Sequence, residues 1–251
     1  MTKIAIIAGS GFDNPQIFKN SREQQILTPY DQTPVFLKIG QIENVETVLL
    51  ARHGQKHTIP PTQINFRANI YALKQANCSH ILATTAVGSL KEEIKPGDLV
   101  VLDQFIDFTK HRLTTFYEKF EAHQPIHTAM AEPFSTYLRQ LLIETSEELN
   151  LRFHHQGTVV TIEGPRFSTK AESKMFKTWG ADVINMSIAP EVILANELNI
   201  PYAAVAMSTD YDCWKEDEET VTWEKVLEIF KQNAEKVTKL LLKTIPKIKS
   251  L

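Results

Sequence analysis

Short apolar runs rich in β-branched residues alternate with longer amphipathic segments along nearly the whole chain. Runs such as His80–Val87 and Tyr202–Ser208 are typical of strands that are buried on both faces of a sheet. Strands of this kind need helices on either side of the sheet to cover them. The pattern therefore predicts an α/β fold, with one domain over residues 1–251 and a central, mostly parallel or mixed sheet flanked by helices.

The expected strands and helices follow one another in a regular order. Strands are expected at Lys3–Ala8, Pro34–Gly40, Glu46–Ala51, His80–Val87, Gly97–Phe105, Gln156–Glu163, Ala181–Ser187 and Tyr202–Ser208. Helices are expected at Pro61–Ala76, Pro133–Leu149, Lys170–Trp179, Pro190–Leu198 and about Thr222–Ile245. The segment Asp107–Met130 fits neither pattern, and a long loop in a compact domain is usually a lid or an interface arm.

The charge balance limits the partners of the chain. It has 27 basic and 30 acidic residues, a formal net charge of −3. A generic nucleic-acid-binding protein would carry a basic excess, so we expect no nucleic-acid partner. Any anion must be held by a local arrangement of donors, because the overall field is mildly repulsive.

The cysteines and the apolar segments bear on the compartment. Cys78 and Cys213 form no CxxC pair, which argues against a disulfide scaffold and favours the reducing cytoplasm. We expect no signal peptide and no membrane partner, since no stretch approaches the ~18 apolar residues of a membrane span. We also expect no metal site: His53 and His57 are spaced as on a metal-binding helix, but Gly54 between them disfavours a helix.

Polar and glycine residues cluster where five expected strands end, which is where α/β sheets bind ligands. The five stretches are Gly9-Ser10-Gly11, Ala51–Gly54, Thr84–Ser89, Glu163–Ser168 and Ser208–Asp212. Arginine, hydroxyl groups and exposed backbone N–H groups suit an oxyanion. Asp210 and Asp212 follow a buried strand, where a carboxyl can gain a raised pKa and act as a general acid.

Each of these stretches also has a purely structural interpretation. Gly9-Ser10-Gly11 can be an ordinary turn, Arg52 can form a surface ion pair, and Phe167 can belong to the core. Known cofactor motifs do not decide the matter. The dinucleotide fingerprint fails at Asn14, and the sequence has no P-loop, nucleophile elbow or zinc motif.

Taken together and in this order, longer segments of the sequence resemble the trimeric purine nucleoside phosphorylase family. They are Ala51–Pro60, Thr84–Leu90, Asp103–Asp107, Met130–Phe134, Ile162–Ser168, Trp179–Met186 and Ala206–Trp214. The resemblance covers essentially the whole chain and is to the branch that acts on 5′-methylthioadenosine. It implies cleavage of an N-glycosidic bond by inorganic phosphate, which is a co-substrate, with no cofactor.

The resemblance also implies roles for individual residues. The phosphate site is expected to comprise Ser10, Arg52, His53, Thr85, the backbone N–H of Ala86, and Ser187. The nucleoside is expected to contact Phe167, Ser168, Met186, His127, Trp223 and Val226. His127 matches a family residue that reaches the adjacent subunit's 5′ pocket, which implies a homotrimer.

Ser168, Asp210 and Asp212 indicate which purine is bound. Members of the family that act on 6-oxopurines typically have Glu and Asn at positions 168 and 210. A 6-amino group is a donor and needs an acceptor such as a carboxylate, while Asp210 with a raised pKa could protonate N7. We expect adenine as the leaving group. A 6-oxopurine or methylthioinosine phosphorylase, a hydrolytic nucleosidase and a non-catalytic nucleotide-binding module remain alternatives.

The sequence departs from the family pattern in three places. Ala8-Gly9-Ser10 replaces a common Gly-Gly-Thr, and Ser187 replaces a usual threonine, but both keep a hydroxyl donor. Trp223 stands where a small aliphatic residue commonly lines the methylthio pocket. The sequence ends at Leu251, before a C-terminal segment that closes this pocket in longer relatives. The preference for the 5′ substituent therefore stays open.

Overall fold

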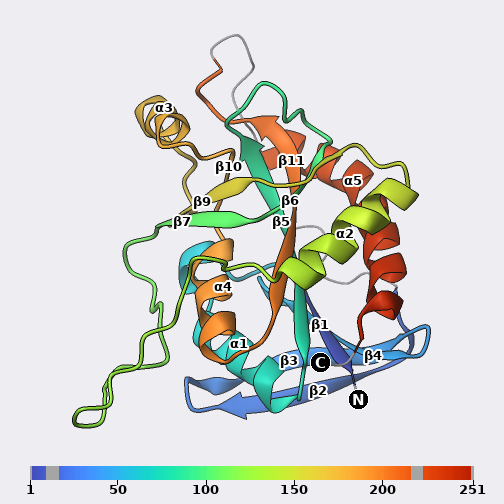
Figure 1. The fold of residues 1–251 in the computed structure, drawn as a ribbon, viewed down its shortest axis with the longest axis vertical. Coiled ribbons are helices and arrows are strands. Elements are labelled where there is room, and N and C mark those ends of the chain that lie inside the picture. Colours follow the sequence, from blue (N-terminus) through green and yellow to red (C-terminus); the bar gives the residue numbers. More distant parts are fainter. Residues whose placement is uncertain (1, 10–16, 216–222, 250–251) are drawn as a thin grey trace.

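A computed structural model describes residues 2–9, 17–215 and 223–249, and its strands join in one mixed sheet (Figure 1). The strands are β1 (Lys3–Ala8), β2 (Lys19–Thr28), β3 (Asp31–Ile42), β4 (Val45–Ala51), β5 (His80–Ser89), β6 (Leu99–Val101), β7 (Gln104–Phe108), β8 (Phe153–His154), β9 (Thr158–Ile162), β10 (Val183–Asn185) and β11 (Tyr202–Tyr211). Their main order is β2-β3-β4-β1-β5-β10-β9-β7, and β11, β6 and β8 branch from β5.

Most of the central pairs are parallel, as predicted. β1 pairs parallel with β4 and β5, β5 pairs parallel with β11, and β9 pairs parallel with β7 and β10. Antiparallel pairs join β2, β3 and β4 on one side and link β10 to β5 and β6 to β11. The expectation of an α/β fold with a mixed central sheet is therefore confirmed.

Helices cover the sheet on both faces (Figure 1). α1 (Phe66–Gln75) and α4 (Ile188–Glu197) pack on one face, where Ile70, Leu73 and Val192 join a single buried apolar cluster. α2 (Thr136–Glu148) and α5 (Trp223–Thr244) pack on the other face, around Leu138 and Val237. α3 (Lys170–Thr178) covers β9 and β10. Two buried apolar layers thus hold the central strands rigid.

Three helices begin where side-chain caps satisfy their first N–H groups. Asn65, Ser135 and Thr169 accept from the backbone of α1, α2 and α3, respectively, and Thr169 and Glu172 form a capping box. The cap at Asn65 also divides the expected helix Pro61–Ala76. A 3₁₀ turn at Pro61–Gln63 precedes it, and α1 starts only at Phe66.

Two sequence expectations about strands were wrong or incomplete. The expected strand Gly97–Phe105 is two strands, because β6 pairs with β11 and β8 while β7 pairs with β9. β2 was not predicted. It lies at the end of the sheet order, and its polar sequence lacks the apolar run of a central strand.

The register around β5 opens a site in the middle of the sheet. β1 pairs with β5 as far as Ala83, and β10 pairs with it at Gly88 and Ser89. Residues 84–87 lie between these two partners on that edge. On the other side, the register with β11 shifts between Ser208 and Asp210, which marks a bulge. A bulge re-aims the side chains that follow it, here those of Asp210 and its neighbours.

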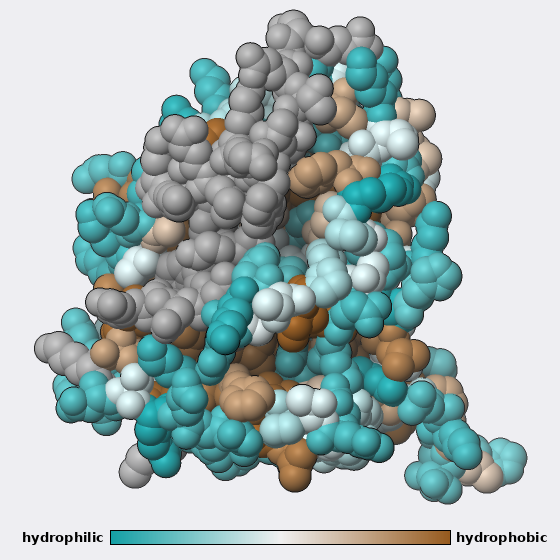
Figure 2. All heavy atoms as spheres, turned by 180° about the vertical axis from the view of Figure 1, so that it is seen from behind, coloured by the Kyte–Doolittle hydropathy of each residue, from teal (hydrophilic) through white to brown (hydrophobic). Residues whose placement is uncertain are grey.

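The chain between β7 and α2 is a long arm, residues 109–135. It projects from the body of the molecule in Figures 1 and 2 and contains one isolated bridge, between Glu121 and Gln124. The irregular segment expected at Asp107–Met130 is confirmed, except that β7 extends to Phe108. Within the described part of the chain, none of the helices is both long and apolar enough to cross a membrane.

Candidate active site

A cavity of about 390 Å³ opens where β5, β10 and β11 meet. Ten of the residues predicted from the sequence line it: Arg52, His53, Thr85, Ala86, Phe167, Ser168, Met186, Ser187, Asp210 and Asp212. Gly9, His57, Asn185 and Thr209 also line it. Stretches that are up to about 200 positions apart in the sequence therefore meet in one place, as expected of strand ends in an α/β sheet.

The described residues that line the cavity do not include the other four predicted site residues. Ser10 lies outside the described residues, and the side chains of Trp223 and Val226 are not described either, although both positions belong to α5. His127 lies on the projecting arm, exposed, with its ring centroid 5.8 Å from that of Phe120. The roles expected of these four residues stay predictions.

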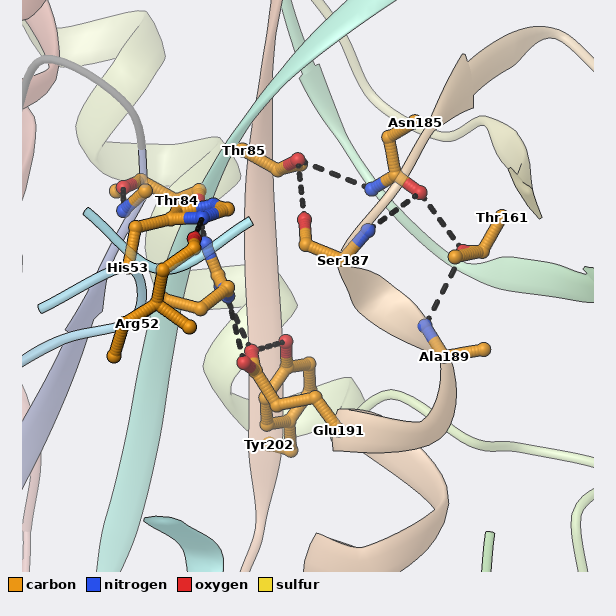
Figure 3. Close-up of polar contacts among 12 residues, drawn as sticks. Arg52, His53, Thr84, Thr85, Thr161, Asn185, Ser187, Ala189, Glu191 and Tyr202 are labelled. Atoms are coloured by element: carbon orange, nitrogen blue, oxygen red, sulfur yellow. Dashed lines mark hydrogen bonds and ion pairs between the residues drawn. The ribbon is translucent and has the colours of Figure 1, made fainter. Parts of the chain in front are cut away.

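One part of the cavity, which we call the hydroxyl end, comprises Arg52, His53, Thr85, Asn185 and Ser187 (Figure 3). All five side chains are buried. The hydroxyl oxygens of Thr85 and Ser187 lie 2.9 Å apart, and Nδ2 of Asn185 donates to Oγ1 of Thr85 at 3.0 Å. Buried hydroxyl groups held side by side in this way can donate to an oxyanion.

Arg52 is held by a buried carboxylate. Its Nε and Nη2 donate to the two carboxylate oxygens of Glu191, each at 2.8 Å, and its Nη1 donates to the carbonyl of Thr84 at 2.9 Å. Tyr202 donates its hydroxyl to Glu191 at 2.6 Å. The alternative of a surface ion pair is therefore wrong. The bidentate contact fixes the plane of the guanidinium group, and Glu191 offsets its charge.

Close approach to Arg52 explains one glycine at the end of β1. A Cβ atom on Gly9 would lie 2.8 Å from Nη1 of Arg52 and 2.8 Å from the carbonyl oxygen of Thr84. No larger residue fits without displacing the arginine, because real Cβ atoms almost never approach other heavy atoms so closely. The Gly9-Ser10-Gly11 stretch is therefore more than a generic turn at its first position.

The ring of His53 is fixed by the backbone. Its Nδ1 lies 2.8 Å from the carbonyl oxygen of Ile59, which can only accept, so Nδ1 carries the hydrogen. The ring of His57 packs against it in a tilted arrangement, with centroids 4.5 Å apart and an interplanar angle of 32°. Among the described residues, no three His, Cys, Asp or Glu side chains gather as metal ligands would.

The opposite part of the cavity, the carboxylate end, comprises Phe167, Ser168, Thr209, Asp210 and Asp212. Ser168 Oγ lies 2.8 and 2.6 Å from the two carboxylate oxygens of Asp212, which is buried. The hydroxyl therefore fixes the orientation of this carboxylate. Phe167 is 46% exposed and lines the cavity, so it does not belong to the core.

Asp210 differs from an ordinary surface carboxyl. Burial and the neighbouring carboxylate of Asp212 raise its pKa to about 6, against a hydrogen bond from Thr209 Oγ1 at 2.7 Å that lowers it. A carboxyl with a pKa near the working pH can hold a proton and release it within one reaction cycle. Asp210 is thus chemically suited to be a general acid.

The two ends are joined by the loop after β9. Gly164 adopts a φ of +66°, and a Cβ atom there would lie 2.5 Å from Sδ of Met186. A glycine is required on both counts. Met186 can therefore lie against this loop, between Asn185 of the hydroxyl end and the loop that leads to Phe167 and Ser168.

The root of the arm is hydrogen-bonded to two segments that adjoin the cavity lining in sequence. The side chain of Arg112, which is almost fully buried, donates to the carbonyl of Ala189 at 2.7 Å and to the carbonyl of Glu163 at 2.8 Å. Ala189 lies two residues after Ser187, and Glu163 directly follows Ile162; Ser187 and Ile162 line the cavity. Arg112 therefore ties the arm root to the segments that carry these two residues.

Comparison with known proteins identifies the family of this chain. The sequence matches the family described as "Phosphorylase superfamily" over residues 3–246. The chain belongs to the phosphorylase superfamily.

Relatives within this superfamily match the full length of the chain. S-methyl-5′-thioadenosine phosphorylases from Danio rerio and Xenopus tropicalis are each 53% identical to it, with 98% and 99% of this chain and 89% and 90% of theirs covered. A solved structure of methylthioadenosine phosphorylase from Schistosoma mansoni in complex with adenine has a TM-score of 0.93 at 42% identity, covering 98% of this chain and 92% of that one.

A second solved structure that resembles this chain contains methylthioadenosine. A mutant of adenosine/methylthioadenosine phosphorylase from Schistosoma mansoni, in complex with methylthioadenosine, has a TM-score of 0.91 at 40% identity and covers 98% of this chain and 91% of that one. The expected nucleoside phosphorylase-like fold is confirmed by these likenesses.

Several residues of this phosphorylase site were not assigned a role from the sequence. They are Thr161, Asn185, Glu191, Tyr202 and Thr209. One signal was available: Glu191 stands between apolar residues in the first turns of α4, and a charged residue in such a place needs a partner if it is buried. The pairing of Asn185 with Thr85, 100 positions away, has no comparable local signal.

Proposed function

We propose that this phosphorylase cleaves the N-glycosidic bond of 5′-methylthioadenosine with inorganic phosphate, releasing adenine and 5-methylthioribose 1-phosphate. The observation that carries the proposal is a single cavity with a carboxyl pair suited to an amino-purine at one end and hydroxyl donors beside a buried arginine at the other. The printed names of relatives that are 53% identical support the same substrate.

At the carboxylate end, the two carboxyl groups divide the recognition of adenine. Asp210 donates a proton to N7 as the glycosidic bond breaks, so that the purine leaves as a neutral molecule. Its pKa of about 6 leaves a fraction protonated at neutral pH. Asp212, oriented by Ser168, accepts a hydrogen bond from the 6-amino group. A 6-oxo group would instead place an acceptor against an acceptor.

At the hydroxyl end, phosphate lies below the ribose. Arg52, His53, Thr85, the N–H of Ala86, and Ser187 bind it together with Ser10, in our proposal. One phosphate oxygen forms the bond to C1′ as the bond from C1′ to N9 breaks, and the electron pair of that bond passes to the purine. Donors already in place stabilise the phosphate beside the developing oxocarbenium ion. Phosphate is a co-substrate in this proposal, and no cofactor is proposed.

The remaining predicted contacts concern the sugar and its 5′ group. We place Met186 under the ribose hydroxyls and Phe167 beside the base, consistent with their positions on the cavity wall. Trp223 and Val226 are proposed to line the methylthio pocket. The preference between methylthio and other 5′ substituents rests on these two side chains.

We further propose a homotrimer in which the arm reaches a neighbouring subunit. The arm carries the exposed apolar residues Leu113, Phe120 and Ile126, which a partner surface would bury. His127 would then contribute to the 5′ pocket of that neighbour. An active monomer in equilibrium sedimentation would contradict this assembly. The presence of two unpaired cysteines favours the cytoplasm as the compartment.

The test of the function is a comparison of substrates in one assay. We expect kcat/KM for 5′-methylthioadenosine to exceed that for inosine, and adenine release to require added phosphate. Faster cleavage of inosine would support the 6-oxopurine alternative and overturn the proposal. Release that does not depend on phosphate would identify a hydrolytic nucleosidase instead.

A further inference from the structure

A chain of buried polar groups leads to the hydroxyl end from Ala189 and Thr161, which do not line the cavity (Figure 3). It runs from the backbone of Ala189 through Thr161 and Asn185 to Thr85 and Ser187. The successive distances are 3.2 Å, 2.8 Å, 3.0 Å and 2.9 Å. Thr161 and Asn185 come from the ends of the adjacent parallel strands β9 and β10, in register with each other.

Two backbone N–H groups fix the direction of these hydrogen bonds. The N–H of Ser187 points at Oδ1 of Asn185 at 3.5 Å, so this amide atom is the oxygen, which can only accept. The hydroxyl of Thr161 must therefore donate to it. The N–H of Ala189 in turn donates to Thr161 Oγ1. No arbitrary choice of amide orientation remains, because a flipped amide would face a donor with a donor.

Asn185 continues this chain of hydrogen bonds to the cavity. The other amide atom of Asn185 is Nδ2, which can only donate, so Thr85 Oγ1 accepts from it. The Thr85 hydroxyl keeps a second acceptor site, and its one hydrogen can go to Ser187 Oγ at 2.9 Å or to the carbonyl oxygen of Ala86 at 3.2 Å. Asn185 therefore fixes the position of Thr85 Oγ1, and Thr85 lies in hydrogen-bond contact with Ser187. The chain of polar groups ends at the cavity, where a hydroxyl of this pair can donate to an anion.

We propose that Asn185 and Thr161 are positioning residues that hold the Thr85 and Ser187 hydroxyls in place to bind phosphate. This rests on the proposed function, in which these two hydroxyls bind the co-substrate. The hydrogen bonds from Ala189 to Thr161, from Thr161 to Asn185 and from Asn185 to Thr85 all run in one direction. Such bonds polarise one another, which strengthens the hydrogen bond that Asn185 donates to Thr85. Thr161 itself touches no substrate, and its effect passes through Asn185.

Thr161→Val tests this role, because it removes the hydroxyl and keeps the shape of the side chain. We expect the KM for phosphate to rise about tenfold, which corresponds to the loss of one well-placed hydrogen bond. The KM for 5′-methylthioadenosine should stay within about twofold, a change of less than half the same energy. Thr161→Ser keeps the hydroxyl and should restore the phosphate KM.

A matched control separates positioning from stability. Thr244 is a fully buried threonine in α5 whose hydroxyl donates to the carbonyl of Leu240, away from the cavity. Thr244→Val loses a buried hydroxyl of the same kind and should leave the phosphate KM unchanged. An unchanged phosphate KM in Thr161→Val, or an equal rise in both KM values, would overturn the proposal.

Calorimetric titration with inorganic phosphate alone keeps the two proposals apart. If the wild-type protein binds phosphate but does not cleave 5′-methylthioadenosine, the proposed substrate fails, and the phosphate Kd of Thr161→Val still tests the positioning role. If the Thr161→Val variant does not fold, Asn185→Asp serves instead. Its carboxylate can still accept from Thr161 but cannot donate to Thr85, so phosphate binding should weaken at least tenfold; unchanged binding would overturn the proposal.

Discussion

The two ends of the cavity are built by different means. At the carboxylate end, Asp210 and Asp212 come from one strand and its bulge, and the decisive property is a titrating group. At the hydroxyl end, the groups come from three separate segments, and buried contacts such as those of Glu191 with Arg52 and of Asn185 with Thr85 hold them in place. Chemistry is thus concentrated in a local stretch at one end, while the other end depends on assembly of the whole fold.

The largest expected effect tests the chemistry of the carboxylate end. Asp210→Asn keeps the shape of the side chain but removes the proton that would go to N7. We expect kcat/KM for 5′-methylthioadenosine to fall by about 10²–10⁴, the usual contribution of a general acid. Binding of inorganic phosphate, measured by calorimetry, should be retained. A fall of less than tenfold would assign the acid role to another group.

The next effect tests the assembly of the hydroxyl end. Glu191→Gln leaves the buried guanidinium group of Arg52 without a counter-charge, and breaking such a pair costs about 3 kcal/mol in the free energy of unfolding. Urea unfolding followed by circular dichroism measures this loss. Glu148→Gln is the matched control, since Glu148 is paired with Lys243 and Lys247 at the surface. Equal urea midpoints for the two variants would contradict the account.

A smaller effect is expected from the orientation of Asp212. Ser168→Ala removes the hydroxyl that contacts both carboxylate oxygens. We expect kcat/KM for 5′-methylthioadenosine to fall about fivefold, the equivalent of one hydrogen bond, because Asp212 is then less well placed for the 6-amino group. Steady-state assays at saturating phosphate check this. An unaffected kcat/KM would mean that the Ser168 contact has no part in reading the base.

A separate effect is a pH dependence of stability. The pKa of Asp210 is raised from 3.8 to about 6, so between these values the folded protein keeps a proton that the unfolded chain has released. The contribution of this group to the free energy of unfolding therefore falls as the pH rises through that window and is constant above it. Asp210→Asn lacks this dependence.

Urea unfolding at several pH values compares the two proteins. The difference in stability between wild type and Asp210→Asn should decline with rising pH up to about 6 and then level off. A difference that stays constant across this range would indicate that the pKa of Asp210 is not raised in the folded protein.

The carboxyl pair of the carboxylate end could be predicted because its two residues are close together in the sequence. Asp210 and Asp212 directly follow an apolar strand, and a carboxyl in that place needs a reason. The buried strands β1, β5 and β11 were equally visible as apolar runs. β2 was not, because its polar sequence at the end of the sheet order lacks that pattern.

The hydroxyl end could be predicted only in part. Arg52 and Thr85 stand in recognisable stretches, but Glu191 lies 139 positions from Arg52, and Asn185 lies 100 from Thr85. Such pairs depend on which strands become neighbours, and no local propensity carries that information. The division of Gly97–Phe105 into two strands escaped prediction for the same reason, since β6 and β7 find different partners.

If the two ends perform separate tasks, variants at the two ends should change different kinetic constants. Measuring kcat and the KM values for phosphate and 5′-methylthioadenosine in Thr161→Val and Ser168→Ala tests this. Each variant is expected to affect one substrate only. Thr161→Val should raise the KM for phosphate alone, and Ser168→Ala should lower kcat/KM for 5′-methylthioadenosine alone. Equal changes in the phosphate and nucleoside constants in both variants would contradict it.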